Sequence, residues 1–281
     1  MERRLTMTYG KVIAVANQKG GVGKTTTSVN LSAGLSLRKK KVLLIDFDPQ
    51  GDSAKALGYI EASRMKQTIS NAMLEMIVSD ECDLRSCIIT TAEGFDLIPA
   101  NEKLANIEAT LSNVDQKETV LKDVLETVKD DYDFIIIDCK PSLGMLTINA
   151  LNSADSVIIP SQAEFLSANG TYQLLNRIQK IKEDKNPNLK VEGILVTMVD
   201  ERTSLGKAIK GQIQNQYGKV FKVFSHSIPR RVTIAESSAA GKSVMSYAPK
   251  CDGAKAYQEL AREVDLCAKR EINKHKDTEP R

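Results

Sequence analysis

The residues between positions 19 and 25 have the types and the spacing of a phosphate-binding loop. This stretch reads Lys19-Gly20-Gly21-Val22-Gly23-Lys24-Thr25, followed by Thr26. Glycines let the backbone curl so that several N–H groups point at one anion, and a helix that starts behind them adds its positive end. Lys24 can reach the outer phosphates of a nucleotide, and the Thr25 hydroxyl can ligate Mg²⁺. The stretch therefore predicts a nucleotide site, and its combined positions disfavour a plain glycine-rich turn.

The front of this loop departs from the usual pattern. Gln18 stands where G-x-x-x-x-G-K-[ST] has glycine, and Lys19 adds a second ammonium group. One lysine suffices for phosphates bound by the same subunit, and two ammonium groups beside one loop repel unless more negative charge arrives. A triphosphate held by a partner subunit would supply that charge. Lys19 is therefore a first indication of a dimer with nucleotides sandwiched between its subunits.

Three acidic residues come at the ends of two apolar runs. Asp46 and Asp48 follow the run at 42–45, and Asp138 ends the run at 132–138. Continuous apolar runs are typical of parallel strands buried on both faces, and such sheets bind ligands at their carboxyl ends. We therefore expect these carboxylates near the phosphate loop, where they would serve Mg²⁺ and a water, with Asp138 in a Walker B position.

Strands and helices alternate along the chain and would position these residues. Strands are expected over 11–16, 42–45, 86–90, 95–98, 132–138, 156–160, 191–198 and 220–225, and helices over 25–40, 67–79, 101–112, 115–129, 166–183, 204–216 and 253–273. Short links between them predict an α/β fold with a doubly wound, mostly parallel sheet and helices on both faces. We expect a flexible N-terminal tail over 1–10, a single P-loop domain over 11–273 and a polar C-terminal tail over 274–281.

Composition sets broad limits on function. The 281 residues are 42% hydrophobic and 27% charged, with a net charge of only +3, so a nucleic-acid surface would have to be a local patch. The first residues lack the apolar segment of a secretory signal, and no run approaches the ~18 apolar residues of a spanning helix. Five scattered cysteines indicate reduced thiols, and with only two histidines a zinc site is disfavoured. A cytoplasmic protein is expected.

Several stretches together resemble the ParA/Soj family, the partition ATPases of the MinD/ParA superfamily with a deviant Walker A motif. The resemblance extends from about 11 to 264 and is carried by residues 19–26, 46–51, 135–144, 146–151 and 228–232. It implies a deviant P-loop NTPase fold, ATP and Mg²⁺ as ligands, and an ATPase that turns over slowly without a partner.

The resemblance also assigns roles to individual residues. Lys19 would cross the dimer interface to the partner's phosphates, Lys24 would be the phosphate-loop lysine, and Asp48 would position or activate the attacking water. Mg²⁺ would be held or supported by Thr25, Asp46 and Asp138. The nucleotide-binding set comprises Gln18, Lys19, Gly20, Gly21, Val22, Gly23, Lys24, Thr25 and Thr26, with Pro229 and Arg231 lining the base.

A cycle follows from the same resemblance. ATP would close a homodimer that binds DNA without sequence preference, and a ParB-type centromere-binding partner would stimulate hydrolysis and release it, which implies a nucleoid-associated protein. DNA contacts are expected from Arg202, Arg230 and Arg231, within a C-terminal half rich in basic residues. Phosphate contacts need such cations but no base-reading geometry, and for any single cation a solvated surface remains open.

Two positions depart from the family pattern. Lys140 stands where the family usually has proline, and its ammonium group could pair with Asp138, pair with a phosphate or point to solvent. Arg231 stands where relatives often have asparagine, and its charge could serve DNA or phosphate instead of the adenine.

Three other functions share this fold. A MinD-like membrane-positioning ATPase would need a C-terminal amphipathic helix with large apolar anchors, but residues 262–276 offer no Phe or Trp, so no stable membrane binding is expected. An iron–sulfur reductase would need two cysteines per subunit at a dimer seam, and Cys139 has no matched second cysteine. A small-molecule ATP-dependent ligase would need a substrate pocket with dedicated anchors, for which no motif is present.

Overall fold

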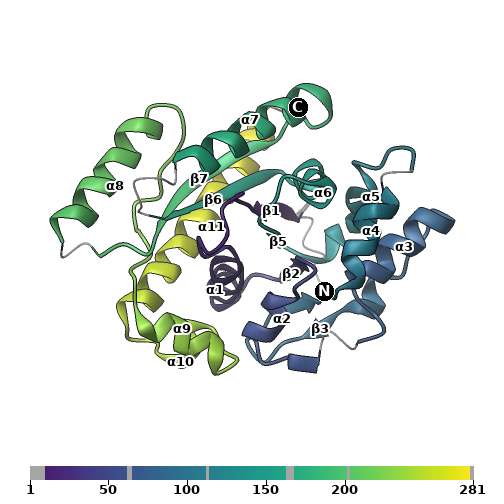
Figure 1. Cartoon of the computed structure of the whole chain (residues 1–281), viewed down its shortest axis with the longest axis horizontal. Coiled ribbons are helices and arrows are strands. Elements are labelled where there is room, and N and C mark those ends of the chain that lie inside the picture. The colour runs from purple at the N-terminus through teal and green to yellow at the C-terminus, as the bar shows by residue number, and fades with distance from the viewer. Residues whose placement is uncertain (1–9, 62–64, 112–113, 163–167, 201–202, 279–281) are drawn as a thin grey trace.

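A seven-stranded sheet forms the centre of the molecule (Figure 1). The computed structural model describes residues 10–61, 65–111, 114–162, 168–200 and 203–278. The strand order is β3-β4-β2-β5-β1-β6-β7, and every neighbouring pair is parallel except β3 and β4. The strands are β1 (Lys11–Val15), β2 (Val42–Phe47), β3 (Ile89–Thr90), β4 (Asp96–Ile98), β5 (Phe134–Cys139), β6 (Ser156–Gln162) and β7 (Lys190–Thr197).

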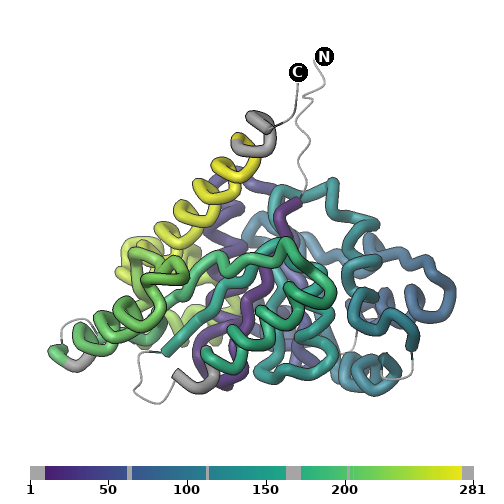
Figure 2. Tube along the Cα trace, turned by 90° about the horizontal axis from the view of Figure 1, so that it is seen from above, coloured from purple at the N-terminus to yellow at the C-terminus, as the bar shows by residue number. Residues whose placement is uncertain are grey.

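Helices cover both faces of the sheet, which confirms the doubly wound α/β fold. One hydrophobic core lies under α1 (Lys24–Leu37), α2 (Asp52–Ala56), α9 (Val232–Ala239), α10 (Val244–Tyr247) and α11 (Asp252–Thr278). The other lies under α3 (Ile69–Ser79), α4 (Lys103–Leu111), α5 (Val120–Glu126), α6 (Met145–Ser153), α7 (Ala168–Asp184) and α8 (Ser204–Tyr217). Figure 2 shows α11 in yellow and α3 in blue on opposite sides of the molecule.

The central strands bring the predicted acids together. Strands β2 and β5 are buried along their whole length, as expected for continuous apolar runs between two helical layers. They pair in a register that places Asp46 opposite Asp138. Strand β1, which leads into the glycine-rich loop, pairs with β5 on one side and β6 on the other. The phosphate loop and both acids therefore lie at one edge of the sheet, at the carboxyl ends of the strands.

Some elements differ from the sequence-based expectations. The strand expected over 220–225 is wrong, because this segment makes only an isolated bridge between Val223 and Ile194 on β7. Helices α2, α6, α9 and α10 were not expected, since they have nine residues or fewer and are too short for a clear helical period. Helix α11 continues to Thr278, beyond the expected end at 273, and Gly10 of the expected tail is buried.

Within the described ranges, no helix combines the length and the apolar character needed to cross a membrane. This finding concerns the helices alone, and the division into a single domain with two tails stays a prediction.

Candidate nucleotide-binding site

The phosphate loop connects β1 to α1 through residues in unusual backbone conformations. Gly21 and Gly23 have φ values of 71° and 87°, in the left-handed region that favours glycine, and α1 begins directly after Gly23. A Cβ atom at Gly21 would meet nothing within 4 Å, so this glycine is required by its backbone angle and not by crowding. The backbone here has the curled shape that turns N–H groups toward an anion.

Asn17 anchors the front of the loop. Its side-chain oxygen accepts a hydrogen bond from the Lys19 N–H at 3.1 Å, and its amide nitrogen donates to the Pro160 carbonyl of β6 at 2.7 Å. The far side of the loop is held by Thr197 of β7, whose hydroxyl donates to the Val22 carbonyl at 2.9 Å. Two neighbouring strands thus fix the loop before any ligand binds.

Lys24 is directed into the loop. Its ammonium group donates to the Lys19 carbonyl at 2.9 Å, and the residue is only 7% exposed. Burial lowers the pKa of Lys24, and the nearby carboxylates of Asp138 and Asp48 partly oppose that shift. A buried cation with so few partners is stabilised by an incoming anion, which is what a phosphate group would be. The position fits the role expected for the phosphate-loop lysine.

Asp138 accepts hydrogen bonds from the hydroxyl groups of two serines. Ser53 donates to Oδ2 at 2.8 Å and Ser28 to Oδ1 at 3.1 Å. The Thr25 hydroxyl also acts to lower the pKa of this carboxylate. Burial nevertheless raises the pKa of Asp138 to about 6, because the side chain is almost completely removed from water. The Thr25 hydroxyl and the Asp138 carboxylate are hard oxygen donors of the kind that Mg²⁺ prefers, so the donor set fits this ion.

Asp46 has a different environment. Its Oδ2 accepts from the backbone N–H groups of Ser53 at 3.0 Å and Ala54 at 3.3 Å, so the carboxylate caps the start of α2. Burial and the neighbouring Asp138 raise its pKa well above the usual range for an aspartate. These contacts give Asp46 a supporting position behind Asp138, and a direct role toward Mg²⁺ stays a prediction.

Asp48 lies at the mouth of the site and is partly exposed. Its Oδ1 accepts from the Gln50 N–H at 3.0 Å, and its carbonyl accepts from the Gly51 N–H at 2.9 Å, which makes a tight turn after β2. Its charge acts on Lys24, so the two groups lie in the same site. Sequence reasoning thus grouped Lys24, Asp48 and Asp138 correctly in space, while their chemical roles remain to be tested.

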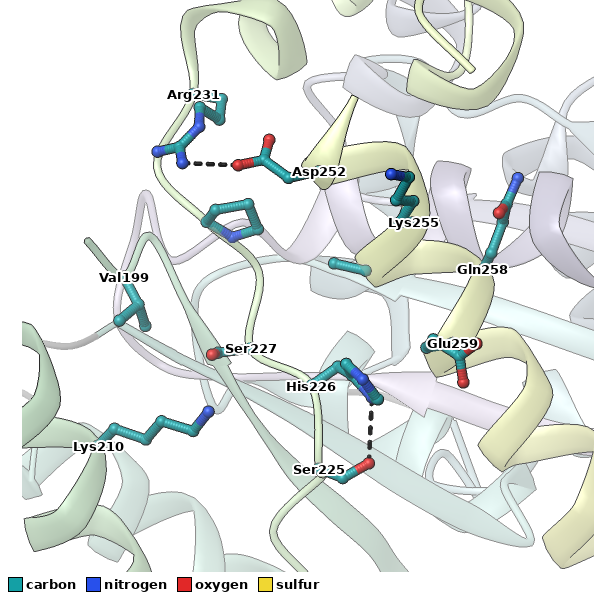
Figure 3. Close-up of a pocket in the computed structure, with 12 residues that line it drawn as sticks. Val199, Lys210, Ser225, His226, Ser227, Arg231, Asp252, Lys255, Gln258 and Glu259 are labelled. Carbon is teal, nitrogen blue, oxygen red and sulfur yellow. Dashed lines mark hydrogen bonds and ion pairs between the residues drawn. The ribbon is translucent and has the colours of Figure 1, made fainter. Parts of the chain in front are cut away.

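Pro229 and Arg231 belong to a segment beyond the end of β7. Pro229 forms a parallel bridge with Val199, and Arg231 makes a 2.6 Å ion pair with Asp252, the first residue of α11. Figure 3 shows this pair beside a pocket of about 690 Å³ between this segment and α11. The positive charge of Arg231 is therefore already matched within the protein, an outcome not among those considered from the sequence.

The other two predicted DNA-binding residues are Arg230 and Arg202. The Arg230 side chain is exposed, and its backbone N–H donates to the Val199 carbonyl at 3.1 Å. Arg202 lies outside the described residues. Arg230 therefore remains an accessible candidate for phosphate contacts, whereas Arg231 is committed to Asp252.

The structure also gives Lys140 a partner that the sequence did not indicate. Its ammonium group pairs with Glu108 of α4 and not with Asp138, and the side chain is 21% exposed. Lys24 is the cation that acts on Asp138.

Cys139 follows Asp138 in β5, and its thiol donates to the carbonyl of Ile137 in the same strand. It is 2% exposed, and burial raises its pKa above that of an ordinary thiol. All five cysteines are free thiols. Among the residues that the structure describes, no three His, Cys, Asp or Glu side chains gather into a metal-binding group.

Sequence reasoning missed five residues that shape the site: Asn17, Ser28, Ser53, Glu108 and Thr197. Only Ser28 carried a usable signal, because it lies one helical turn after Lys24 and therefore on the same side of α1. Each of the other four contacts a partner far away in the sequence, which local patterns do not reveal.

The raised pKa of Asp138 predicts a pH dependence of stability. Between its unfolded value near 3.8 and about 6, the folded chain binds more protons than the unfolded chain, so this group's contribution to stability falls as pH rises through about 6. In nucleotide-free, metal-free protein, Asp138→Asn should therefore be more stable than wild type by up to about 3 kcal/mol at pH 7.5. Urea unfolding of both proteins at pH 5 and 7.5 measures this, and a difference that shrinks toward neutral pH would contradict it.

Comparison with known proteins identifies the family. A family model described as an AAA domain matches residues 10–191. The sporulation initiation inhibitor protein Soj of Bacillus subtilis (strain 168) is 45% identical over 256 residues, which cover 91% of this chain and 98% of the relative. The chain belongs to the ParA/Soj family of partition ATPases. Within this family, the chromosome partitioning protein ParA of Caulobacter vibrioides (strain NA1000 / CB15N) is 39% identical, with 90% and 93% of the two chains covered.

Solved structures share the fold of this chain. A protein described as cobyrinic acid a,c-diamide synthase from Mycobacterium smegmatis, with bound ADP and magnesium, has a TM-score of 0.78 and 36% identity, with 90% and 93% coverage. The cell division ATPase MinD of Pyrococcus furiosus, 23% identical with a TM-score of 0.72 and coverage of 92% and 99%, shares the fold. The first of these neighbours of the ParA/Soj chain thus holds ADP and magnesium.

Proposed function

We propose that this chain is an ATP-driven DNA partition switch. Mg-ATP binding closes a homodimer that binds DNA without sequence preference, and hydrolysis stimulated by a ParB-type partner releases the DNA. The observation that carries this proposal is the two-lysine loop. Lys24 is turned inward onto the Lys19 carbonyl, where it would serve the phosphates of its own subunit. Lys19 adds a second lysine at the front of the same loop, at the position that the family resemblance links to the phosphates of a partner subunit.

The chain's own residues would act mainly by positioning. The loop N–H groups and Lys24 would hold the outer phosphates, and Asp48 at the mouth would orient the attacking water. Thr25 and Asp138 would hold Mg²⁺, which neutralises phosphate charge when bound. No covalent bond to the protein is needed in such a site, and the rate of hydrolysis depends on how well the water and the phosphate are aligned. Slow turnover in the isolated protein follows from this arrangement.

Phosphate release with and without DNA and the protein encoded beside this chain tests the switch. We expect slow hydrolysis by the protein alone and marked stimulation when both are present. Rapid intrinsic hydrolysis that neither addition changes would contradict the proposal.

A second candidate comes from the M. smegmatis structure described as a diamide synthase. At 36% identity, that description points to a ligase that couples ATP hydrolysis to a small substrate. The same assay separates the two functions, because stimulation by DNA favours partition, and stimulation by a carboxylate substrate and an amide donor favours the ligase. Sedimentation with vesicles in the presence of ATP tests the MinD-like alternative.

DNA retention should depend more on Arg230 than on Arg231. Arg230 is exposed, while Arg231 is neutralised by Asp252 at 2.6 Å. We expect Arg230→Ala, combined with Arg202→Ala, to abolish DNA binding while ATP-dependent dimerisation persists, and Arg231→Ala to weaken binding only a few-fold. Filter binding at two salt concentrations, with dimerisation followed by sedimentation, measures both effects. Salt-resistant binding by the double variant would contradict the assignment.

A further inference from the structure

The loop that follows Asp138 is tied to a helix from elsewhere in the chain. This β5–α6 loop (residues 140–144) leaves the carboxyl end of β5, where the Asp138 carboxylate lies, and leads into α6. Its conformation therefore decides what lies beside the Walker B acid. Glu108, which lies 32 residues from Lys140 in the sequence and on α4, contacts both ends of this loop.

One carboxylate makes both contacts. Glu108 Oε2 accepts from the Lys140 ammonium group at the start of the loop, and Oε1 accepts from the Leu146 N–H, at 3.4 Å, in the first turn of α6. Both side chains of the ion pair are about one-fifth exposed, at 21% and 23%, so the pair is partly shielded from solvent. A negative charge at the start of α6 is favourable because the helix end carries free N–H groups.

Gly144 and Ser142, which lie between these two contacts, leave room for the Glu108 side chain and hold the loop in shape. Gly144 is the N-cap residue of α6 and offers no side chain to cap it, so Glu108 supplies an acceptor from another helix. A Cβ atom at Gly144 would lie only 2.3 Å from Glu108 Oε1. Ser142 ties the loop internally, because its N–H donates to the Lys140 carbonyl at 2.9 Å and its carbonyl accepts from the Thr147 hydroxyl at 2.7 Å.

We propose that Glu108 is a positioning residue, which holds the β5–α6 loop in place beside Asp138 through Lys140 and the start of α6. This inference rests on the proposed ATP hydrolysis. The ion pair with Glu108 holds the Lys140 ammonium group away from the Asp138 carboxylate, so that Lys24 remains the cation acting on Asp138. The pair should therefore matter for turnover of bound nucleotide and little for nucleotide affinity, because Glu108 and Lys140 lie outside the phosphate loop.

A double-variant cycle tests the pair. Lys140→Met removes the ammonium group, and Glu108→Gln removes the charge but keeps an acceptor for the Leu146 N–H. Each should lower kcat at saturating Mg-ATP about fivefold with ATP affinity unchanged, and the double variant should match either single variant because both break the same contact. Glu108→Ala also removes the acceptor and should lower kcat further, by about 20-fold.

Two further variants serve as controls for this double-variant cycle. Lys140→Pro stiffens the loop without an ion pair, because Pro141 already restricts residue 140 to extended backbone, and in this background Glu108→Gln should lose its effect. Arg85→Met breaks a 2.6 Å ion pair with Asp131, which lies near the amino end of β5 and thus at the opposite edge of the sheet, and should leave kcat unchanged.

Hydrogen exchange provides a readout that is independent of hydrolysis. In nucleotide-free protein, the segment 140–147 should exchange faster in Glu108→Ala than in wild type, with no change in the phosphate loop. Additive single variants, a loss confined to ATP affinity, or unchanged exchange would each overturn the positioning role. A wild-type protein that hydrolyses no ATP would instead contradict the proposed function, and the exchange comparison would still decide whether Glu108 holds the loop.

Discussion

Replacing Asp48 with alanine is expected to lower ATP hydrolysis at least 100-fold, while ATP still binds. The carboxylate lies at the mouth of the site, partly exposed, and its backbone forms the turn after β2 through the 2.9 Å bond between Gly51 N–H and the Asp48 carbonyl. Alanine keeps that turn and removes only the group that would orient water. Phosphate release under stimulating conditions and titration with a fluorescent ATP analogue separate hydrolysis from binding.

The trapped state gives a second measure of the same variant. If hydrolysis releases DNA, Asp48→Ala should accumulate as an ATP-bound dimer that stays on DNA. Asp52→Ala is a matched control, because Asp52 lies four residues away, is 58% exposed and pairs with Lys55 at 3.0 Å. Hydrolysis by Asp48→Ala above one-tenth of the wild-type rate would rule out a central role for this carboxylate.

The second large effect is expected from Lys19→Ala, which should abolish ATP-dependent dimerisation and hydrolysis but leave nucleotide binding by the monomer nearly intact. The Lys24 ammonium group donates to the Lys19 carbonyl at 2.9 Å, and alanine keeps this carbonyl. The substitution therefore keeps the backbone contact that holds Lys24 in the loop. Sedimentation velocity with and without Mg-ATP measures dimerisation.

A contrast between the two lysines sharpens this test. Lys24→Met should lose nucleotide binding itself, because it removes the buried cation of the loop. Lys55→Ala is a control for a lysine near the mouth of the site, since its side chain is 45% exposed and pairs with Asp52. A Lys19→Ala protein that still dimerises with ATP would mean that the second lysine serves its own subunit's phosphates.

The sequence was sufficient for the parts of the site that depend on local pattern. The loop at 19–26 and the acids at the carboxyl ends of β2 and β5 were predictable because glycine spacing, a lysine and apolar runs all occur in contiguous residues. Ser28 and Ser53 escaped notice because their hydroxyls meet Asp138 across 110 and 85 residues of chain. The Glu108–Lys140 pair was missed for the same reason, since the packing of α4 against α6 brings the two together.

The expected strand at 220–225 failed for a related physical reason. Four of its six residues are Val or Phe, which suit a strand, but β7 is the edge strand of the sheet, and the segment meets it at a single bridge through Val223. Residue types favourable to a strand do not show how much of a neighbouring strand is available for pairing. Pairing partners, like side-chain partners, are decided by the assembled fold.

The ion pair between Arg231 and Asp252 has a consequence for how long the protein would stay on DNA. A cation paired with a carboxylate of its own chain displaces fewer counterions from a nucleic acid than an unpaired cation, so it adds less to the salt-sensitive part of the attraction. Under the proposed function, each subunit would bind the phosphate backbone with less positive charge than its arginine count suggests. Its dissociation would then be faster, and its exchange between DNA sites correspondingly more frequent, than in a chain with a neutral residue at position 252.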